Sequence, residues 1–131
     1  MQILQPPGWA RPKGYSNGIA VRGGRTVYVA GQVGWNGENV FAGTSFGAQF
    51  RQALANIVAV LAEAGGRPEH IVRMTWYVVE RTEYLQALGE IGAAYRELIG
   101  RHYPVMTVVE VRGLMEPEAR LEIEATAVIP D

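Results

Sequence analysis

The sequence contains no cysteine among its 131 residues and only two histidines. The absence of cysteine excludes disulfide bonds and thiolate catalysis, and it removes the strongest class of zinc site. His70 and His102 stand far apart, and neither has a second histidine at metal-ligand spacing. Aspartate occurs once, at Asp131, so there is no acidic metal-binding loop. We therefore expect no metal site.

Two common enzyme signatures are also missing. The only serines are Ser16 and Ser45, and neither lies in a nucleophile-elbow motif. No glycine-rich loop has the spacing at which a strand passes into a dinucleotide-binding helix. These absences argue against a serine hydrolase and against a dinucleotide-dependent enzyme.

Long apolar runs and basic stripes are absent as well. Charged residues or glycines interrupt every apolar stretch, so none could span a bilayer. The segment that begins Met1-Gln2-Ile3-Leu4 lacks the basic and apolar parts of a signal peptide, so we expect a cytoplasmic location. Twelve basic residues and thirteen acidic ones are scattered along the chain, whereas binders of phosphate backbones usually show a basic stripe. We expect neither nucleic acid nor a membrane as partner.

The composition that remains, 48% hydrophobic and 19% charged, is typical of a compact globular protein. The length predicts a single domain over residues 1–131. Three prolines in residues 1–15 favour an extended arm over a helix. Two short β-type runs, 18–21 and 26–30, flank Gly23-Gly24 and predict a hairpin. The sequence Arg22-Gly23-Gly24-Arg25 resembles an RNA-binding RGG unit, but a single copy between apolar runs is interpreted as the hairpin turn.

The first helix is predicted from a cap at Thr44 or Ser45 to about Ala64, with Gly65-Gly66 as its stop. Its expected buried stripe, from which Gln49 is excluded, consists of Phe46, Phe50, Leu54, Ile57, Val58 and Leu61.

A second helix is predicted to begin at Thr82 or Glu83 and to end at Gly100. Its expected buried stripe consists of Leu88, Ile91, Tyr95 and Leu98. Gly89 and Gly92 share a face of this helix, which suggests a close approach of its backbone to the sheet.

Strands are predicted at 72–79, 107–111 and 121–129, which are rich in β-branched and aromatic residues. The order β-β-α-β-α-β-β predicts an α+β fold, a mixed sheet with two helices on one face. Segments 27–30 and 75–78 are apolar at successive positions, hence on both faces of the sheet. Since two helices cover only one face, we expect a homo-oligomer to bury the other.

Carboxylates on strands are the remaining candidates for chemistry. Glu122 and Glu124 alternate with apolar residues, so both project from one face of the last strand, and Glu110 is expected on the neighbouring strand. One interpretation is the solvated face of an antiparallel hairpin. The other is a partly buried carboxylate at a subunit seam, with a raised pKa and able to activate water.

Six segments, spread over nearly the whole chain, carry a family resemblance. They are GYSNG (14–18), VAGQ (29–32), QALANI (52–57), AGG (64–66), PVMTVVEVR (104–112) and LEIEATAV (121–128). In this order they resemble the RidA/YjgF family. The resemblance implies a chorismate-mutase-like fold and a homotrimer that binds a small-molecule ligand in clefts at its subunit interfaces. It also implies hydrolytic deamination of a small 2-enamino or 2-imino acid, without metal or organic cofactor.

The resemblance also assigns roles by motif position. Tyr15 matches the family's cleft tyrosine, and Glu122 matches the carboxylate that orients water. Gly31 matches the backbone group beside the ligand, and Thr107 matches the strand residue after the family's arginine. Tyr15 has an alternative role as an interface aromatic, and Gly31 as the residue that permits a tight strand end.

One substrate-binding position departs from the family. The family's arginine, two residues after the proline of the 104–112 segment, is Met106 here. Arginine binds a carboxylate through a planar two-pronged contact, whereas a thioether offers neither charge nor donors. The chain thus resembles a divergent subgroup that lacks the active-site arginine. Arg11 and Lys13, near Tyr15 in the sequence, are candidates for the missing positive charge.

Two functions stay open at this point. The first is a RidA-like hydrolase that deaminates or hydrolyses a small enamine or imine metabolite, with its substrate choice altered by Met106. The second is a non-enzymatic trimer that binds a small molecule. A ribonuclease or translation inhibitor conflicts with the balanced charge.

Overall fold

The computed structural model describes all residues, 1–131, as an α+β protein. The elements are β1 (Gln2–Leu4), β2 (Gly18–Ala20), β3 (Arg25–Val33), α1 (Phe46–Glu63), a short 3-10 helix (Pro68–His70), β4 (Ile71–Val78), α2 (Arg81–Gln86), α3 (Leu88–Leu98), β5 (Val105–Glu110) and β6 (Leu121–Ile129). The fold class expected from the sequence is confirmed. No helix is both long enough and apolar enough to cross a membrane.

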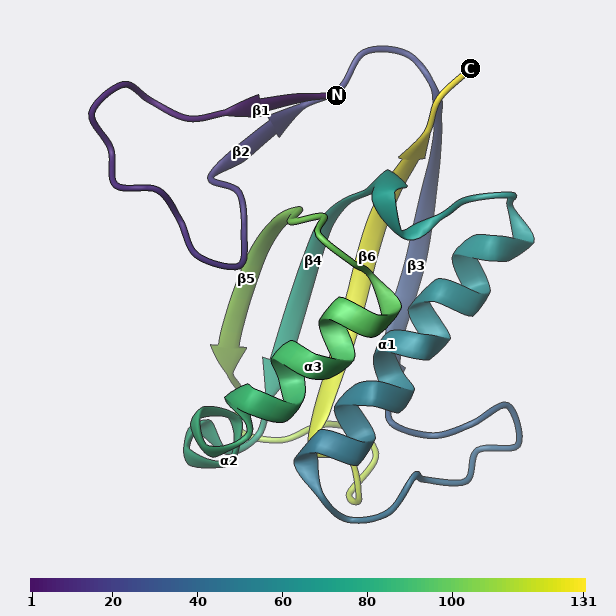
Figure 1. Cartoon of the computed structure of the whole chain (residues 1–131). Helices are drawn as coiled ribbons and strands as arrows, with labels where there is room; N and C mark the ends of the chain where they lie inside the picture. The colour runs from purple at the N-terminus through teal and green to yellow at the C-terminus, as the bar shows by residue number, and fades with distance from the viewer.

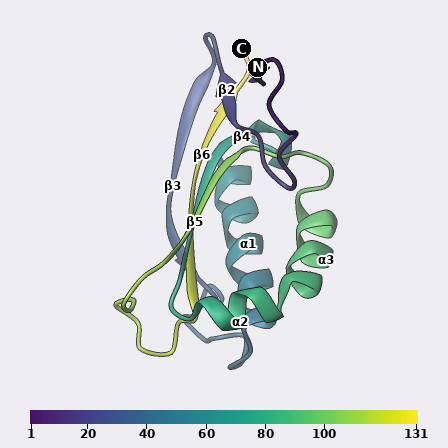
Figure 2. The same ribbon diagram turned by 90° about the vertical axis from the view of Figure 1, so that its left-hand side faces the viewer.

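The main sheet has four strands in the order β3-β6-β4-β5 (Figure 1). Strand β6 runs antiparallel to both β3 and β4, whereas β4 and β5 are parallel. A parallel pair needs a crossover connection, and α2 with α3 supplies it. All helices lie on one face of the sheet, as predicted, and the other face is left open by this chain (Figure 2).

The predicted hairpin around Gly23-Gly24 is wrong. The turn itself exists, because both glycines have positive φ (68° and 81°). The strands that it joins belong to different sheets, however, since β2 pairs with β1 and β3 pairs with β6. Strand β6 offers β3 a nine-residue partner, whereas β2 has only three residues. The arm thus forms its own two-stranded sheet.

Helix α1 follows its prediction except that Val58 is only partly buried and that one polar residue joins the buried stripe. Ser45 caps it by accepting a hydrogen bond from the Ala48 backbone N–H (3.3 Å), and Gly65 ends it with φ +78°. Gln49, which was expected outside the buried stripe, is only 1% exposed. It is buried because its amide nitrogen donates to the carbonyls of Gly43 and Glu118, and its oxygen accepts from the Arg120 N–H. A polar clamp therefore lies inside the apolar stripe.

The second predicted helix is two helices that meet at Ala87. Leu88 opens α3 and is 49% exposed, so its predicted burial is wrong, whereas Ile91 and Tyr95 are buried as expected. The suggested close approach of this helix to the sheet is also wrong. A Cβ at Gly89 would meet nothing within 4 Å, and one at Gly92 would meet only the Arg96 guanidinium (3.3 Å).

The core lies between the helices and the covered face of the sheet. Trp76 of β4 is central to it, with its ring 4.9 Å from that of Phe50 and 6.4 Å from that of Tyr95. The open face is less apolar than the sequence suggested. Tyr28 is 79% exposed there, but its neighbours across the sheet include Thr75 and Glu124. This face is a mixed surface.

Candidate functional site

The sheet separates the five predicted site residues into two groups. Tyr15 and Met106 lie on the side of the helices, where both line a cavity. Thr107 lies on the open face, because successive residues of a strand point to opposite faces. Gly31 and Glu122 lie together on that open face as well. No single chain brings all five into one site.

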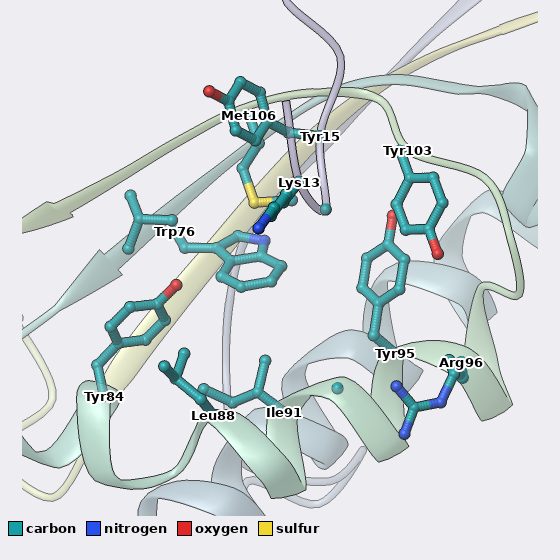
Figure 3. A pocket seen from close by; sticks show the side chains of 13 residues that line it. Lys13, Tyr15, Trp76, Tyr84, Leu88, Ile91, Tyr95, Arg96, Tyr103 and Met106 are labelled. Atoms are coloured by element: carbon teal, nitrogen blue, oxygen red, sulfur yellow. The ribbon is translucent and has the colours of Figure 1, made fainter. Parts of the chain in front are cut away.

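The cavity, which we call the helix-side pocket, has a volume of about 510 Å³. Figure 3 shows the arm and β5 on one side of it and α3 on the other. The residues that line it are Lys13, Gly14, Tyr15, Trp76, Tyr84, Leu88, Ile91, Gly92, Tyr95, Arg96, Tyr103, Met106 and Val108. A cavity of this size and apolar character is typical of small-molecule sites.

Ser16 holds the arm against β5 and so places its neighbour Tyr15. The Ser16 N–H donates to the Pro104 carbonyl (3.2 Å), and its hydroxyl donates to the Tyr103 carbonyl (2.6 Å). Ser16 is 7% exposed, so neither bond competes with bulk water. The buried Ser16 therefore holds the GYSNG segment at the edge of the pocket.

Aromatic rings form much of the pocket wall. Tyr95 and Tyr103 stack with an interplanar angle of 5° and centroids 5.9 Å apart. The Tyr95 hydroxyl donates to the His102 carbonyl (2.5 Å), and burial raises the pKa of the Tyr95 phenol, so it stays neutral. Trp76 is 6% exposed, and its indole nitrogen is the one buried side-chain nitrogen or oxygen without a hydrogen-bond partner.

Two cations and no carboxylate line the pocket. Lys13 extends into it beside Met106 (Figure 3). The Arg96 guanidinium lies next to Gly92 on α3. Neither forms an ion pair. Arg11, the other candidate for the missing positive charge, lines a different depression. Of the two predicted candidates, Lys13 is thus the one beside Met106.

Trp76 and Arg96 are pocket residues that were not predicted from the sequence. Trp76 was assigned to a strand without a role, and Arg96 was not considered. The available signal for Arg96 was its position four residues after Gly92, which places the two on one helix face. Nothing in the sequence could show that the Trp76 indole lacks a partner.

On the open face, Glu122 lies against the backbone of β3. A Cβ built at Gly31 would stand 2.1 Å from the Glu122 Oε2, so only glycine fits beside this carboxylate. A register shift between Val29 and Gln32 sets the position of Gly31. Burial, and secondly the charge of Glu124, raise the pKa of the Glu122 carboxyl. A carboxylate of this kind can accept a proton from water.

The surroundings of Glu122 are polar. The Tyr77 hydroxyl donates to Glu124 (2.6 Å), and this hydrogen bond raises the pKa of the Tyr77 phenol. Thr107, Tyr77 and Glu124 line a shallow depression of about 700 Å³ on this face. In the pairing of β4 with β6, Glu122 is the partner of Tyr77, and Glu124 is the partner of Thr75.

Glu110 does not belong to this group. It was expected on the strand next to β6, but β4 lies between β5 and β6. Its carboxylate instead accepts a hydrogen bond from the Arg81 N–H (2.7 Å) at the start of α2. The antiparallel hairpin that would have paired it with Glu122 does not exist. No cluster of three or more histidine, aspartate or glutamate side chains could hold a metal ion.

Sequence comparisons identify relatives over nearly the full length. The family model described as Endoribonuclease L-PSP matches residues 9–129. A RutC family protein of Aquifex aeolicus is 32% identical over 129 residues, which cover 98% of this chain and 99% of that protein. A 2-iminobutanoate/2-iminopropanoate deaminase of Escherichia coli is 29% identical over 108 residues, which cover 80% of each protein.

Solved structures resemble the fold closely. The Rid family protein YyfB of Yersinia pestis, described as of unknown function, superposes with a TM-score of 0.86 at 32% identity and covers 98% of each chain. A member of the YjgF/YER057c/UK114 family from Mycobacterium tuberculosis superposes with a TM-score of 0.65 at 35% identity, covering 89% of this chain and 88% of that one.

Proposed function

Because the chain belongs to the Endoribonuclease L-PSP family, with the RutC and YjgF proteins, we propose that it hydrolyses a small enamine or imine metabolite. The reaction takes place in clefts between the subunits of a homotrimer and uses no metal or organic cofactor. The observation that carries this proposal is Glu122, a carboxylate with a raised pKa for which Gly31 leaves space. The deaminase among the relatives supports the reaction class.

Glu122 has the chemistry that imine hydrolysis requires. It accepts a proton from water while the water oxygen bonds to the imine carbon. The proton then passes to the nitrogen, which gives a carbinolamine. The hydroxyl proton of the carbinolamine moves to the nitrogen as the C–N bond breaks, so that ammonia leaves and a carbonyl compound forms. A raised pKa suits both roles, because the group must take up the proton and then release it.

The separation of the two groups of residues supports association of copies of this chain, and the family resemblance suggests three. Tyr15 and Met106 lie on the helix side, and Glu122 lies on the open face of the same chain. A cyclic assembly that packs the pocket edge of one subunit against the open face of the next brings the two groups together. It also buries the mixed surface that contains Tyr28.

We infer from Met106 that the chain belongs to a divergent subgroup with an altered substrate. Its thioether faces the pocket where the family resemblance expects an arginine. Loss of a charge-assisted contact costs about 1.5–3 kcal/mol of binding free energy. Met106 therefore disfavours small polar imino acids and favours substrates with more apolar surface.

The reaction is tested with semicarbazide, which traps an imino acid before it hydrolyses. Purified protein is expected to accelerate the hydrolysis of at least one imino acid over buffer. A Glu122→Gln variant is expected to lose at least about 100-fold in rate. Glu63→Gln, on the exposed side of α1, is the matched control and keeps full activity. Absence of acceleration for every imino acid tried contradicts the proposal.

A non-enzymatic small-molecule-binding trimer is the second candidate. The specific observation in its favour is Met106 in an aromatic pocket on the face opposite Glu122. A ligand that raises the melting temperature and is recovered unchanged supports binding alone. A Glu122→Gln variant that binds the ligand but has lost turnover supports the enzyme.

A further inference from the structure

Few strand pairs join β3 to β6 at the end of the sheet that holds Glu122. A register shift divides the β3–β6 pairing just after Val29, and only two residue pairs follow it, the last of them Val33 with Glu122. Gly31, which leaves space for the Glu122 carboxylate, lies within the shift. A bulge interrupts the ladder of hydrogen bonds, so this short end has little support from the rest of the β3–β6 pairing.

Asn56 of α1 holds the β3 side of this end. Its amide nitrogen donates to the carbonyls of Val33 (3.2 Å) and Trp35 (2.7 Å). Its oxygen accepts from the Gln52 amide (2.8 Å), which fixes the orientation of the Asn56 amide so that its donors face the backbone. Asn56 therefore holds β3 at the residue that pairs with Glu122.

Gln49 holds the β6 side of the same end. It lies seven residues before Asn56, hence on the same face of α1. Its oxygen accepts from the Arg120 N–H (2.8 Å), and its nitrogen donates to the Glu118 carbonyl (3.1 Å), just before β6 begins. Gln49 also packs closely on the end of β3, since a Cβ built at Gly34 would stand 2.5 Å from the Gln49 Cβ. This residue therefore connects the start of β6 with the end of β3.

Loss of these hydrogen bonds would move the end of the sheet. Gln49 is 1% exposed and Asn56 is half-buried, so their hydrogen bonds are shielded from bulk water. A buried carbonyl or N–H without a partner costs free energy, and it regains a partner by turning toward water. Because the pairing past Val29 is short, that movement would separate β3 from β6. The contact between Gly31 and Glu122 would open with it.

We propose that Gln49 and Asn56, together called the α1 clamp, are positioning residues that hold the Glu122 carboxylate against Gly31. They act through the two strands, because α1 lies on the face of the sheet opposite to Glu122 (Figure 2). The effect on catalysis rests on the proposed function, whereas the position of Glu122 is a property of the chain itself.

A carbon-13 NMR titration of the Glu122 carboxyl in the full-length protein tests the clamp without a substrate. Burial, and secondly the charge of Glu124, raise the pKa of this carboxyl; Tyr77 faces it from β4, and the residues of β3 beside it do not titrate. Gln49→Met keeps the side-chain length but removes all three hydrogen bonds. Glu122 is then expected to become more exposed, and its pKa to fall toward that of an ordinary glutamate. An unchanged pKa in the folded variant overturns the proposal.

Asn56→Leu decides the matter if Gln49→Met does not fold, since Asn56 is only half-buried. It is expected to lower the pKa of Glu122 in the same direction, and an unchanged pKa in this variant likewise overturns the proposal. Ile57→Ala, at a fully buried core residue of the same helix, is the matched control. It is expected to lower the melting temperature by several degrees and to leave the pKa of Glu122 unchanged. An equal fall of the pKa in Ile57→Ala would assign the effect to lost stability and overturn the clamp.

Imine hydrolysis, measured in parallel, separates this proposal from the proposed function. In the clamp variants Glu122 is present but displaced, so kcat is expected to fall about tenfold while KM stays within about twofold. A lowered pKa of Glu122 in the clamp variants, without hydrolysis by the unaltered protein, supports the clamp and contradicts the enzyme. Hydrolysis whose kcat is unchanged in both clamp variants overturns the clamp alone.

Discussion

The two faces of the main sheet carry opposite chemistry on the same strands. On the helix side, Lys13 and Arg96 line an aromatic pocket without any carboxylate. On the open face, Glu122 and Glu124 stand on β6 in polar surroundings. Strand alternation alone produces this division, because Met106 and Thr107 are adjacent in sequence and point to opposite sides. The difference teaches that one chain separates its aromatic pocket from its strand carboxylates, and the proposed homotrimer is the arrangement that would combine them.

The largest expected effect comes from an extra methyl group on the open face. A Gly31→Ala change places a Cβ 2.1 Å from the Glu122 Oε2, so the carboxylate must move away. We expect imine hydrolysis to fall about 100-fold, because proton transfer depends on the position of that carboxylate. Gly37→Ala, where a Cβ meets nothing within 4 Å, is the control.

A smaller effect is expected from a new charge on the helix side. Met106→Arg introduces a third cation into the pocket and a two-pronged carboxylate contact. Pyruvate affinity, measured by titration calorimetry, is expected to rise about tenfold. Met115→Arg, at a side chain that is 93% exposed, should leave this affinity unchanged. A pyruvate affinity that does not rise in the Met106→Arg protein would show that the side chain at position 106 does not contact the acid.

A Glu124→Gln change is expected to alter the rate of hydrolysis by less than tenfold at any one pH. Protonation of Glu122 removes the base, so the rate falls as the pH drops through its raised pKa. Glu124→Gln removes the second cause of the raised pKa, and the acidic limb of kcat/KM is expected to move to lower pH. Burial, the larger cause, remains, so the limb should stay above that of an ordinary glutamate. If the acidic limb of kcat/KM does not move, Glu122 is not the group whose protonation lowers the rate.

The smallest expected effect is the difference between alanine substitutions at two glycines of α3. Alanine at Gly89 or Gly92 should each raise the free energy of unfolding by about 0.5–1 kcal/mol, since alanine favours the helix. Only Gly92→Ala crowds the Arg96 guanidinium (3.3 Å), so only this variant should weaken pyruvate binding, by a few fold. Thermal unfolding and calorimetry on both variants check the pair. Equal ligand affinity in the two variants would mean that the Arg96 guanidinium can move aside without weakening binding.

Local patterns in the sequence predicted the regular elements well. The limits of β6 were predicted as residues 121–129 and are observed there, and α1 begins after the predicted cap at Ser45. Both depend on neighbours within a few positions, through alternation in the strand and side-chain capping in the helix. Strand partners depend on distant segments, which is why the hairpin at Gly23-Gly24 and the place of Glu110 were wrong.

The candidate site was predictable only in part for a related reason. Motif position indicated Tyr15 and Met106, and the structure places both in one pocket. Gln49 and Trp76 could not be predicted, because the surrounding segments decide whether a buried polar group finds a partner. Gln49 satisfies its amide with distant backbone groups, whereas the Trp76 N–H has none.

The attachment of the arm through Ser16 has a consequence for how the molecule assembles. The hydrogen bond from Ser16 to the Tyr103 carbonyl joins residues 87 positions apart, and it brings Lys13 and Tyr15 to the pocket. Strands β3 and β6 close loops that are longer still, but their nine-residue pairing offsets the loss of chain entropy, whereas Ser16 contributes only two hydrogen bonds. We therefore expect the sheet and helices to fold first and the pocket to form last. A newly made chain would then be a stable scaffold before it is able to bind anything.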